Sequence, residues 1–173
     1  MRVTRRAGLM LSAATAMAAT VVPGPGLSAV AEPAARPAAS ESRSFAPEAD
    51  VSHHGRVALR DEHLGVMVRT ENSGPSSLVD ATVRLRFSVP LAARQQLPRD
   101  CLRSGDRAVL CATGALGAGG DARRTAFGLR LTGRPAEVVV RVDTVWNGGA
   151  SDRDRRNDTH EVLALSTGDA YVF

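Results

Sequence analysis

Residues 80–90 have the sequence DATVRLRFSVP, in which apolar and polar side chains alternate up to the closing proline. The apolar positions are Ala81, Val83, Leu85, Phe87 and Val89. A period of two is typical of a β-strand with one buried and one solvated face. Proline ends such a strand because it has no N–H to donate. This stretch therefore predicts a strand that turns one face to a core.

The same alternation appears on both sides of this stretch. Further strands are predicted at residues 57–60, 63–69, 108–112, 124–131, 138–146 and 161–165. Turn-forming sequences such as Asn72-Ser73-Gly74-Pro75 separate them, and no stretch has a convincing helical period. About seven short strands with regular turns predict an all-β chain, folded as an immunoglobulin-like antiparallel sandwich.

Two local expectations go with this fold. Leu91 to Leu97 is long enough for one helical turn, and Trp146 is expected in the core because it ends a buried strand. Carbohydrate-binding sandwiches stack sugars on exposed aromatic rings, so a buried Trp146 does not favour sugar binding.

The first 31 residues have the organisation of a secretory signal peptide. Three arginines lie within the first six residues, an apolar stretch follows from Ala7 to Val22, and the small-residue triplet Ala29-Val30-Ala31 predicts cleavage before Glu32. The apolar stretch is shorter than the roughly 20 residues that a bilayer requires, so the mature protein is expected to have no membrane span. We therefore expect a secreted protein, free or associated with the cell wall. Export by the general secretory route and by the twin-arginine route both fit.

The rest of the chain divides into a linker and one domain. Residues 32–50 are rich in Ala, Pro and Ser and cannot bury enough apolar surface to offset their chain entropy, which predicts a disordered linker. Residues 51–173 are long enough for a single domain with its own core.

The charge of the mature protein argues against nucleic-acid binding. Subtracting Arg2, Arg5 and Arg6 of the predicted leader from the net charge of +4 leaves +1, whereas binding to a phosphate backbone needs a clustered basic face. All 22 basic residues are Arg, so lysine-dependent Schiff-base chemistry is excluded.

Cys101 and Cys111 are the only cysteines, and the turn-forming residues Ser104-Gly105-Asp106 lie midway between them. A hairpin there places the two sulfur atoms opposite each other. In an exported protein such a pair predicts a structural disulfide, while a metal or redox pair would prefer closer spacing and further ligands.

An oxygen-rich loop precedes the last predicted strand. Its candidate metal ligands are Asp152, Asp154, Asn157 and Asp158, and calcium prefers such oxygen ligands. The spacing differs from that of an EF-hand, and three interleaved arginines offset the negative charge. A self-paired, solvated turn is the alternative.

The sequence contains no recognisable catalytic pattern. The four histidines, His53, His54, His63 and His160, lack the usual metal-ligand spacing and are expected at the surface. There is no Gly-x-Ser-x-Gly elbow, no His-Glu-x-x-His and no phosphate-binding glycine loop. We therefore predict no catalytic residue and a protein that is not an enzyme. A site assembled from scattered loop residues is the alternative.

The turns carry a family resemblance. Four segments together resemble the conserved-repeat immunoglobulin-like family called domain of unknown function eleven. They are Asn72-Ser73-Gly74-Pro75-Ser76, the strand up to Pro90, the cysteine hairpin with the following Gly114-Ala115-Leu116, and the Asp152–Asp158 loop. The resemblance covers about Val57 to Leu165. It implies an immunoglobulin-like fold on a bacterial surface or secreted protein, with one copy where the family often has tandem repeats. It transfers no catalytic residue.

These observations predict a secreted, non-enzymatic module with an extracellular protein-interaction role or a cell-surface structural role. Its partner, a protein or a cell-wall component, is unknown. The binding surface is expected in the loops at one end of the sandwich, or in the tail Tyr171-Val172-Phe173 added as a strand to a partner sheet. The more economical interpretation of that tail is a final strand of the domain itself. A calcium-stabilised adhesive domain and a secreted enzyme or enzyme inhibitor are the alternative functions.

Overall fold

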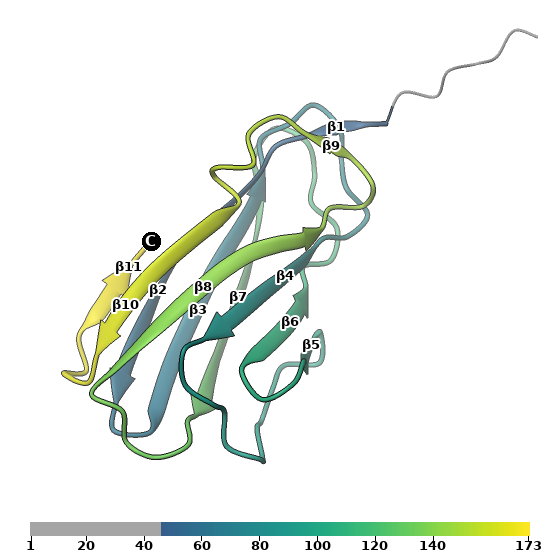
Figure 1. Cartoon of the computed structure of the whole chain (residues 1–173). Helices are drawn as coiled ribbons and strands as arrows, with labels where there is room; N and C mark the ends of the chain where they lie inside the picture. The colour runs from purple at the N-terminus through teal and green to yellow at the C-terminus, as the bar shows by residue number, and fades with distance from the viewer. Residues whose placement is uncertain (1–45) are drawn as a thin grey trace, which may run out of the picture. The chain divides into compact units, whose positions relative to one another are not determined.

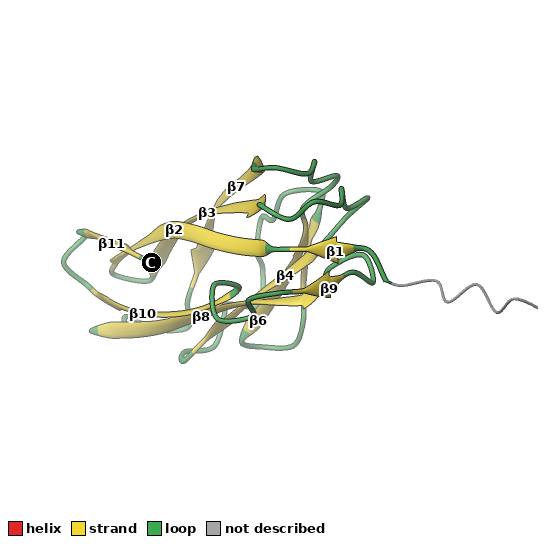
Figure 2. Ribbon diagram, turned by 90° about the horizontal axis from the view of Figure 1, so that it is seen from above, coloured by secondary structure: helices red, strands yellow, loops and turns green. Residues whose placement is uncertain are grey.

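The computed structural model describes residues 46–173, which form a sandwich of two antiparallel sheets (Figure 1). Seen from above, the two sheets form separate layers (Figure 2). The predicted signal peptide and most of the predicted linker lie outside the described residues. One sheet has the order β10-β8-β4-β6-β5 and the other the order β11-β2-β3-β7. The strands are β1 (Glu48–Ala49), β2 (Val51–Arg60), β3 (His63–Asn72), β4 (Thr82–Phe87), β5 (Cys101–Arg103), β6 (Ala108–Ala112), β7 (Asp121–Arg130), β8 (Glu137–Trp146), β9 (Ser151–Asp152), β10 (Thr159–Leu165) and β11 (Ala170–Val172).

The prediction of an all-β antiparallel sandwich is confirmed. β4 lies in the middle of the five-stranded sheet, and its apolar residues Val83, Leu85 and Phe87 are all buried. They pack against the inward residues of β2 and β3 from the opposite sheet. Each fully buried aliphatic side chain of this kind stabilises the fold by about 2 kcal/mol. The alternation in residues 80–90 therefore positions the core.

The turn after β3 is organised by a buried asparagine. Asn72 is fully buried, and its Oδ1 accepts hydrogen bonds from the N–H of Asp50 (3.1 Å) and the N–H of Gly74 (3.0 Å). Its Nδ2 donates to the carbonyl of Ser76 (2.8 Å). A Cβ on Gly74 would lie 2.5 Å from the Cα of Ala49, so only glycine fits here. The turn sequence thus holds the segment before β2 against the domain.

The folded domain begins before the predicted boundary at residue 51. Glu48–Ala49 forms β1, which pairs in parallel with β9, and Ala49 is completely buried. The end of the predicted disordered linker is therefore ordered. Composition did not reveal this because the contacts that order it come from Asn72, Gly74 and β9, which are distant in the sequence.

The helical turn expected at Leu91 to Leu97 is absent from the described structure. Leu91 forms a β-bridge with Leu131, and its N–H donates to the carbonyl of Asp106 (2.7 Å). The next N–H, of Ala92, donates to the carbonyl of Arg130 (2.8 Å). The carbonyls that a helical turn would use as acceptors are also engaged, because the guanidinium of Arg103 donates to those of Leu91 (3.1 Å), Ala92 (2.8 Å) and Ala93 (3.0 Å).

The core position expected for Trp146 is wrong, since its side chain is 46% exposed. The pairing of β4 with β8 shifts register between Thr82 and Val83, which lie opposite Trp146 and Thr144. This irregularity interrupts the alternation of inward and outward side chains after Val142. The argument against sugar binding that rested on a buried Trp146 therefore no longer holds.

The C-terminal tail is a strand of the domain itself. β11 pairs antiparallel with β2, with Tyr171 opposite Val57. Beyond β11, the backbone of Phe173 exchanges two hydrogen bonds of 3.1 Å with Gly55. The tail is thus already paired within the chain, which confirms the more economical interpretation.

The predicted disulfide is present. Cys101 and Cys111 are bonded and lie directly opposite each other in the hairpin of β5 and β6. Both are part of the buried core cluster, so the bond joins the three-residue edge strand β5 to the centre of the sandwich.

Candidate functional site

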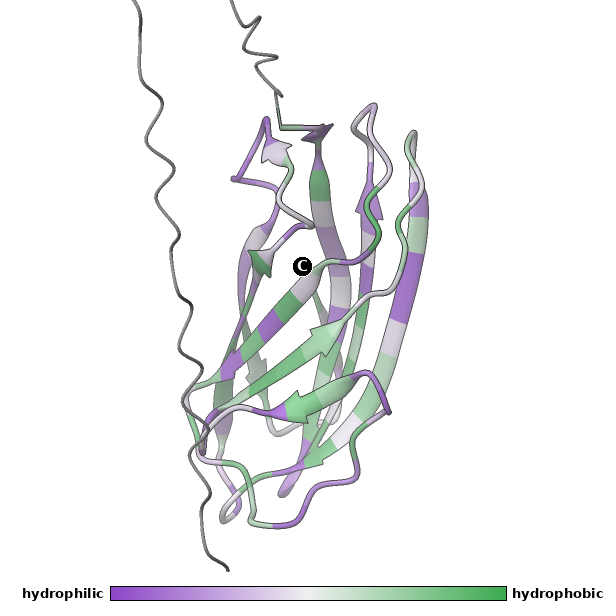
Figure 3. Ribbon diagram, turned by 90° about the vertical axis from the view of Figure 1, so that its right-hand side faces the viewer, coloured by the Kyte–Doolittle hydropathy of each residue, from purple (hydrophilic) through white to green (hydrophobic). Residues whose placement is uncertain are grey.

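The outer edge of β7, called here the β7 edge, is the longest edge of either sheet in residues 46–173. β7 is ten residues long and ends the four-stranded sheet, with β3 as its only neighbouring strand. Figure 3 shows this side of the domain. The far end of β7 is capped, because Gln95 accepts from the N–H of Arg130 (3.0 Å) and donates to its carbonyl (2.7 Å). The amide of Gln95 thus takes the place of a peptide group of a neighbouring strand.

The cap shows which backbone groups point outward. In an antiparallel pair, successive residues turn their N–H and C=O alternately toward and away from the neighbour. Since those of Arg130 point away from β3, those of Gly128, Ala126, Arg124 and Ala122 do so as well. Within residues 46–173, no hydrogen bond engages these four N–H and four C=O groups. They form an unpaired ladder along most of the strand.

The inward side of β7 is incompletely covered. Thr125 and Phe127 point toward the opposite sheet but are only half-buried. They line a small hollow between the sheets together with Val83 of β4 and Cys111 of β6. A strand added beside β7 would therefore gain side-chain contacts as well as backbone hydrogen bonds.

A larger cavity lies at the capped end of the β7 edge. Its volume is ≈ 550 Å³, compared with ≈ 290 Å³ for a polar pocket near β9. Arg94, Gln95, Gly128 and Arg130 are among its lining residues. Gly128 has no side chain to fill the space, and a Cβ there would meet nothing within 4 Å. Sequence reasoning predicted the strand but missed the site, because alternation does not show which strand is at an edge.

The structure does not assemble the four candidate calcium ligands into one site. Asp152 accepts backbone N–H groups from Val51 (3.0 Å) and Asp154 (3.0 Å). The carboxylate of Asp154 is bound by the guanidinium of Arg156 (2.9 and 3.3 Å), and this hydrogen bonding lowers the pKa of Asp154. Within residues 46–173, no group of three or more His, Cys, Asp or Glu side chains is arranged to hold a metal ion.

Of the other two candidate ligands, Asn157 has a buried Oδ1 that no hydrogen-bond donor of residues 46–173 reaches. The amide nitrogen of Asn157 donates to Asp50 (2.8 Å), and Asp158 accepts from the hydroxyl of Thr159 (2.9 Å). Burial raises the pKa of Asp158. The oxygens of Asp152, Asp154 and Asp158 thus accept hydrogen bonds, as in a self-paired turn, and that of Asn157 does not.

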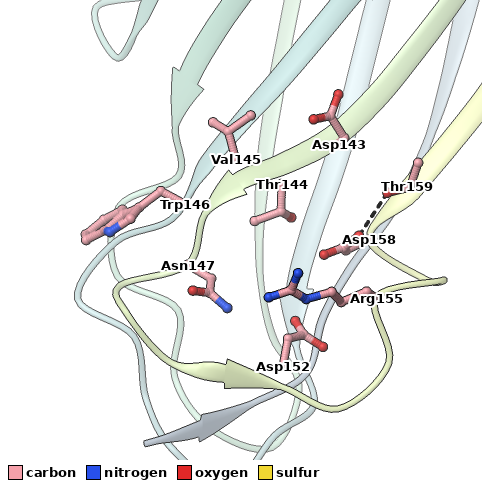
Figure 4. A pocket seen from close by; sticks show the side chains of 9 residues that line it. All are labelled: Asp143, Thr144, Val145, Trp146, Asn147, Asp152, Arg155, Asp158 and Thr159. Carbon is pink, nitrogen blue, oxygen red and sulfur yellow. Dashed lines mark hydrogen bonds between the residues drawn. The ribbon is translucent and has the colours of Figure 1, made fainter. Parts of the chain in front are cut away.

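A polar pocket of ≈ 290 Å³ lies between this loop and the end of β8 (Figure 4). The guanidinium of Arg155 lies near Asp152 and Asp158, while the indole of Trp146 points away from them. The third carboxylate, of Asp143, is bound by Arg84 at 2.6 and 3.3 Å. The pocket therefore contains two carboxylates beside one guanidinium, and the indole of Trp146 is not stacked over them.

The surface position expected for the histidines is wrong for His53. Its side chain is fully buried in β2, and its two ring nitrogens lie 3.0 Å from the hydroxyl of Thr70 and 2.8 Å from that of Thr144. These threonines belong to opposite sheets, so His53 links the two layers. His54 and His63 are exposed as predicted. The missed signal was the alternation of Val51, His53, Gly55, Val57 and Leu59, which extends β2 toward the N-terminus.

His53 should make the domain sensitive to mild acid. Burial lowers the pKa of His53 from 6.5 to about 4, so between these values the unfolded chain binds a proton that the folded chain does not. The contribution of neutral His53 to the free energy of unfolding is fully present above pH 6.5. Below pH 6.5 this free energy falls by about 1.4 kcal/mol per pH unit, which is about 2 kcal/mol between pH 7 and pH 5. Denaturant unfolding at the two pH values measures this loss. In His53→Leu the loss should shrink, and an unchanged loss would contradict the assignment.

The described residues thus define a small antiparallel β-sandwich with one disulfide and one open edge. Residues 46–173 contain no helix that is long and apolar enough to cross a membrane. Comparisons with protein-family models, curated proteins and solved structures find no match to this chain. The resemblance to the immunoglobulin-like repeat family therefore stays a prediction.

Proposed function

We propose that this chain is an exported, non-enzymatic binding module that recognises a protein partner outside the cell by adding an extended segment of that partner to the β7 edge. Strand addition of this kind gains affinity from main-chain hydrogen bonds and specificity from alternate side chains. The observation that carries the proposal is the unpaired ladder from Ala122 to Gly128.

The other edges of the two sheets are shorter than the β7 edge. β5 and β11 have only three residues each, and β10 has seven. Proteins commonly protect edges with short strands, prolines or covering segments, because an exposed long edge invites pairing with another chain. β7 has ten residues without proline, and only its last residue is capped by Gln95. An edge of this length without such protection is expected in a protein that binds a partner there.

Export is supported by the disulfide. Disulfides persist in oxidising compartments, and the Cys101–Cys111 bond agrees with the predicted signal peptide. A binding role rather than catalysis is supported by the way the polar side chains are used. His53 links two sheets, Asp143 is bound by Arg84, and Asp154 is bound by Arg156.

A proline substitution tests the proposed function. Ala126→Pro removes an outward N–H from the middle of the β7 edge and inserts a ring that obstructs pairing, while the bond of β7 to β3 does not use this N–H. Wild-type protein should retain a specific partner from the producer's secreted and wall fractions, and Ala126→Pro should lose it. The measurement is affinity capture followed by mass spectrometry.

Leu163→Pro is the matched control. Val139 turns its backbone toward Ser88, so Leu163, which lies opposite it in β10, has its own N–H on the outer edge. This variant therefore places a proline at an edge N–H far from β7. Both variants are checked for thermal unfolding, and Ala122→Pro replaces Ala126→Pro if that variant does not fold. Equal capture by all folded variants would overturn the role of the β7 edge.

A further inference from the structure

We infer that the segment bound at the β7 edge alternates acidic and apolar residues, with acidic side chains on the solvent face of the sheet and apolar side chains toward the opposite sheet. This inference rests on the proposed function and specifies the chemistry of the partner. The two faces of β7 differ in character, and an added strand presents alternate side chains to each.

The solvent face of the β7 edge is basic. Arg124 and Arg130 both project on this face and are exposed, and Arg69 of β3 lies directly beside Arg124. Arg69 pairs with Glu71, and Arg130 lies 3.5 Å from Glu62. Arg124 forms no ion pair within residues 46–173. An opposite charge on an added strand would therefore be favourable next to Arg124.

Small neighbours leave Arg124 accessible to the added strand. The residues before and after it on the same face are Ala122 and Ala126. Neither side chain extends far enough to block an acidic side chain that approaches along the edge. One carboxylate directly opposite Arg124 and another on the adjacent diagonal position are thus both within reach of its guanidinium.

The inner face of the β7 edge is apolar around Phe127, and Arg123 is its one charged residue. Thr125 and Phe127 are half-buried, and Val68, Val83 and Leu85 line the hollow beside them, together with Thr70, Thr113 and Arg123. An apolar side chain at each inward position of the added strand would cover Phe127 and the mouth of this hollow. Covering such surface is favourable at about 25 cal/mol per Å². A polar side chain at the same position would lose its water without a partner.

A second copy of the chain fits this edge poorly. Pairing two β7 strands would place Arg124 and Arg130 of both copies on the solvent face and Arg123 of both copies on the inner face, with Asp121 as the only acidic residue that each strand supplies. Like charges on adjacent strands oppose pairing. An acidic segment of a different chain avoids this repulsion and neutralises the arginines.

Labelled peptides of seven residues test the inference, since this length spans Ala122 to Gly128. The probes alternate Val with Glu, with Ser or with Lys, and a fourth probe contains four Glu followed by three Val. Binding to the full exported protein is measured by fluorescence anisotropy, and amide chemical shifts locate the site. The alternating Glu/Val peptide should bind at least tenfold more tightly than the Lys/Val peptide. The preference should weaken in high salt because exposed charges are screened.

Substitutions at the β7 edge test the preference for acidic residues separately from the binding of a strand at this edge. Arg124→Glu should weaken binding of the Glu/Val peptide about fivefold and strengthen that of the Lys/Val peptide. Ala126→Pro should abolish binding of every peptide, and Leu163→Pro should leave it unchanged. Equal affinity for the Glu, Ser and Lys peptides, or for the block peptide, would overturn the inference while the proposed edge recognition stands. If no peptide shifts the amides of β7, or if the protein forms dimers that Ala126→Pro dissociates, the acidic partner is ruled out.

Discussion

Replacing Asn72 by alanine should lower the free energy of unfolding by about 3 kcal/mol or more, because each buried group left without a partner costs about 1–3 kcal/mol. The groups affected are the N–H of Asp50, the N–H of Gly74 and the carbonyl of Ser76. Asn72 is fully buried, so water cannot replace the lost hydrogen bonds. A loss of this size corresponds to a melting temperature about 10 °C lower for a domain of this length. Thermal and denaturant unfolding measure it.

Two further variants identify the cause. Ser73→Ala changes the exposed neighbour in the same turn and should alter stability by less than about 0.5 kcal/mol. Asn72→Asp keeps the oxygen that accepts from Asp50 and Gly74 but turns a second carboxylate oxygen toward the carbonyl of Ser76. Its stability should therefore recover in part as the pH falls and the carboxyl group gains a proton. A wild-type melting temperature for Asn72→Ala would refute the structural role of this residue.

Removing the disulfide should have a comparable effect through a different mechanism. The Cys101–Cys111 bond closes a ring of about 11 residues, which stabilises the fold by about 3 kcal/mol in the chain-entropy model. The double variant Cys101→Ala, Cys111→Ala should therefore melt about 10 °C below the wild type. The three-residue strand β5 should be the first part to lose protection from hydrogen exchange.

A reducing agent provides the control for this prediction. It should lower the melting temperature of the wild type to that of the double variant and leave the double variant unchanged. The intact mass of the natural product should show the predicted leader removed and both sulfur atoms oxidised. Retention of Met1 or of two free thiols would contradict the proposed export.

Much of the architecture followed from local patterns. The strand in residues 80–90 was predicted because Val83, Leu85 and Phe87 alternate with polar residues, and all three are buried. The disulfide was predicted because a turn lies midway between Cys101 and Cys111. Alternation failed at Trp146, where the irregular pairing of β4 with β8 interrupts the period.

The candidate site was much less predictable. Residues 124–131 were recognised as a strand, but its place at the edge of a sheet depends on which strands pair with it. Gln95 caps Arg130, which is 35 residues further along the chain. This contact was not predicted, because Leu91 to Leu97 was expected to form a helical turn. The buried position of His53 was missed because the predicted first strand began too late, at Val57.

The sequence alone determined the fold class, the disulfide and the order along the chain of the seven strands that it predicted. These features depend on side-chain period and turn chemistry, which act between residues that are close in sequence. Only the tertiary structure decided that β11 closes on β2, that Asn72 anchors the residues before β2, and that β7 is left open. Strand order within a sheet is set by long-range pairing and by packing across the core. No local pattern in the chain records either of them.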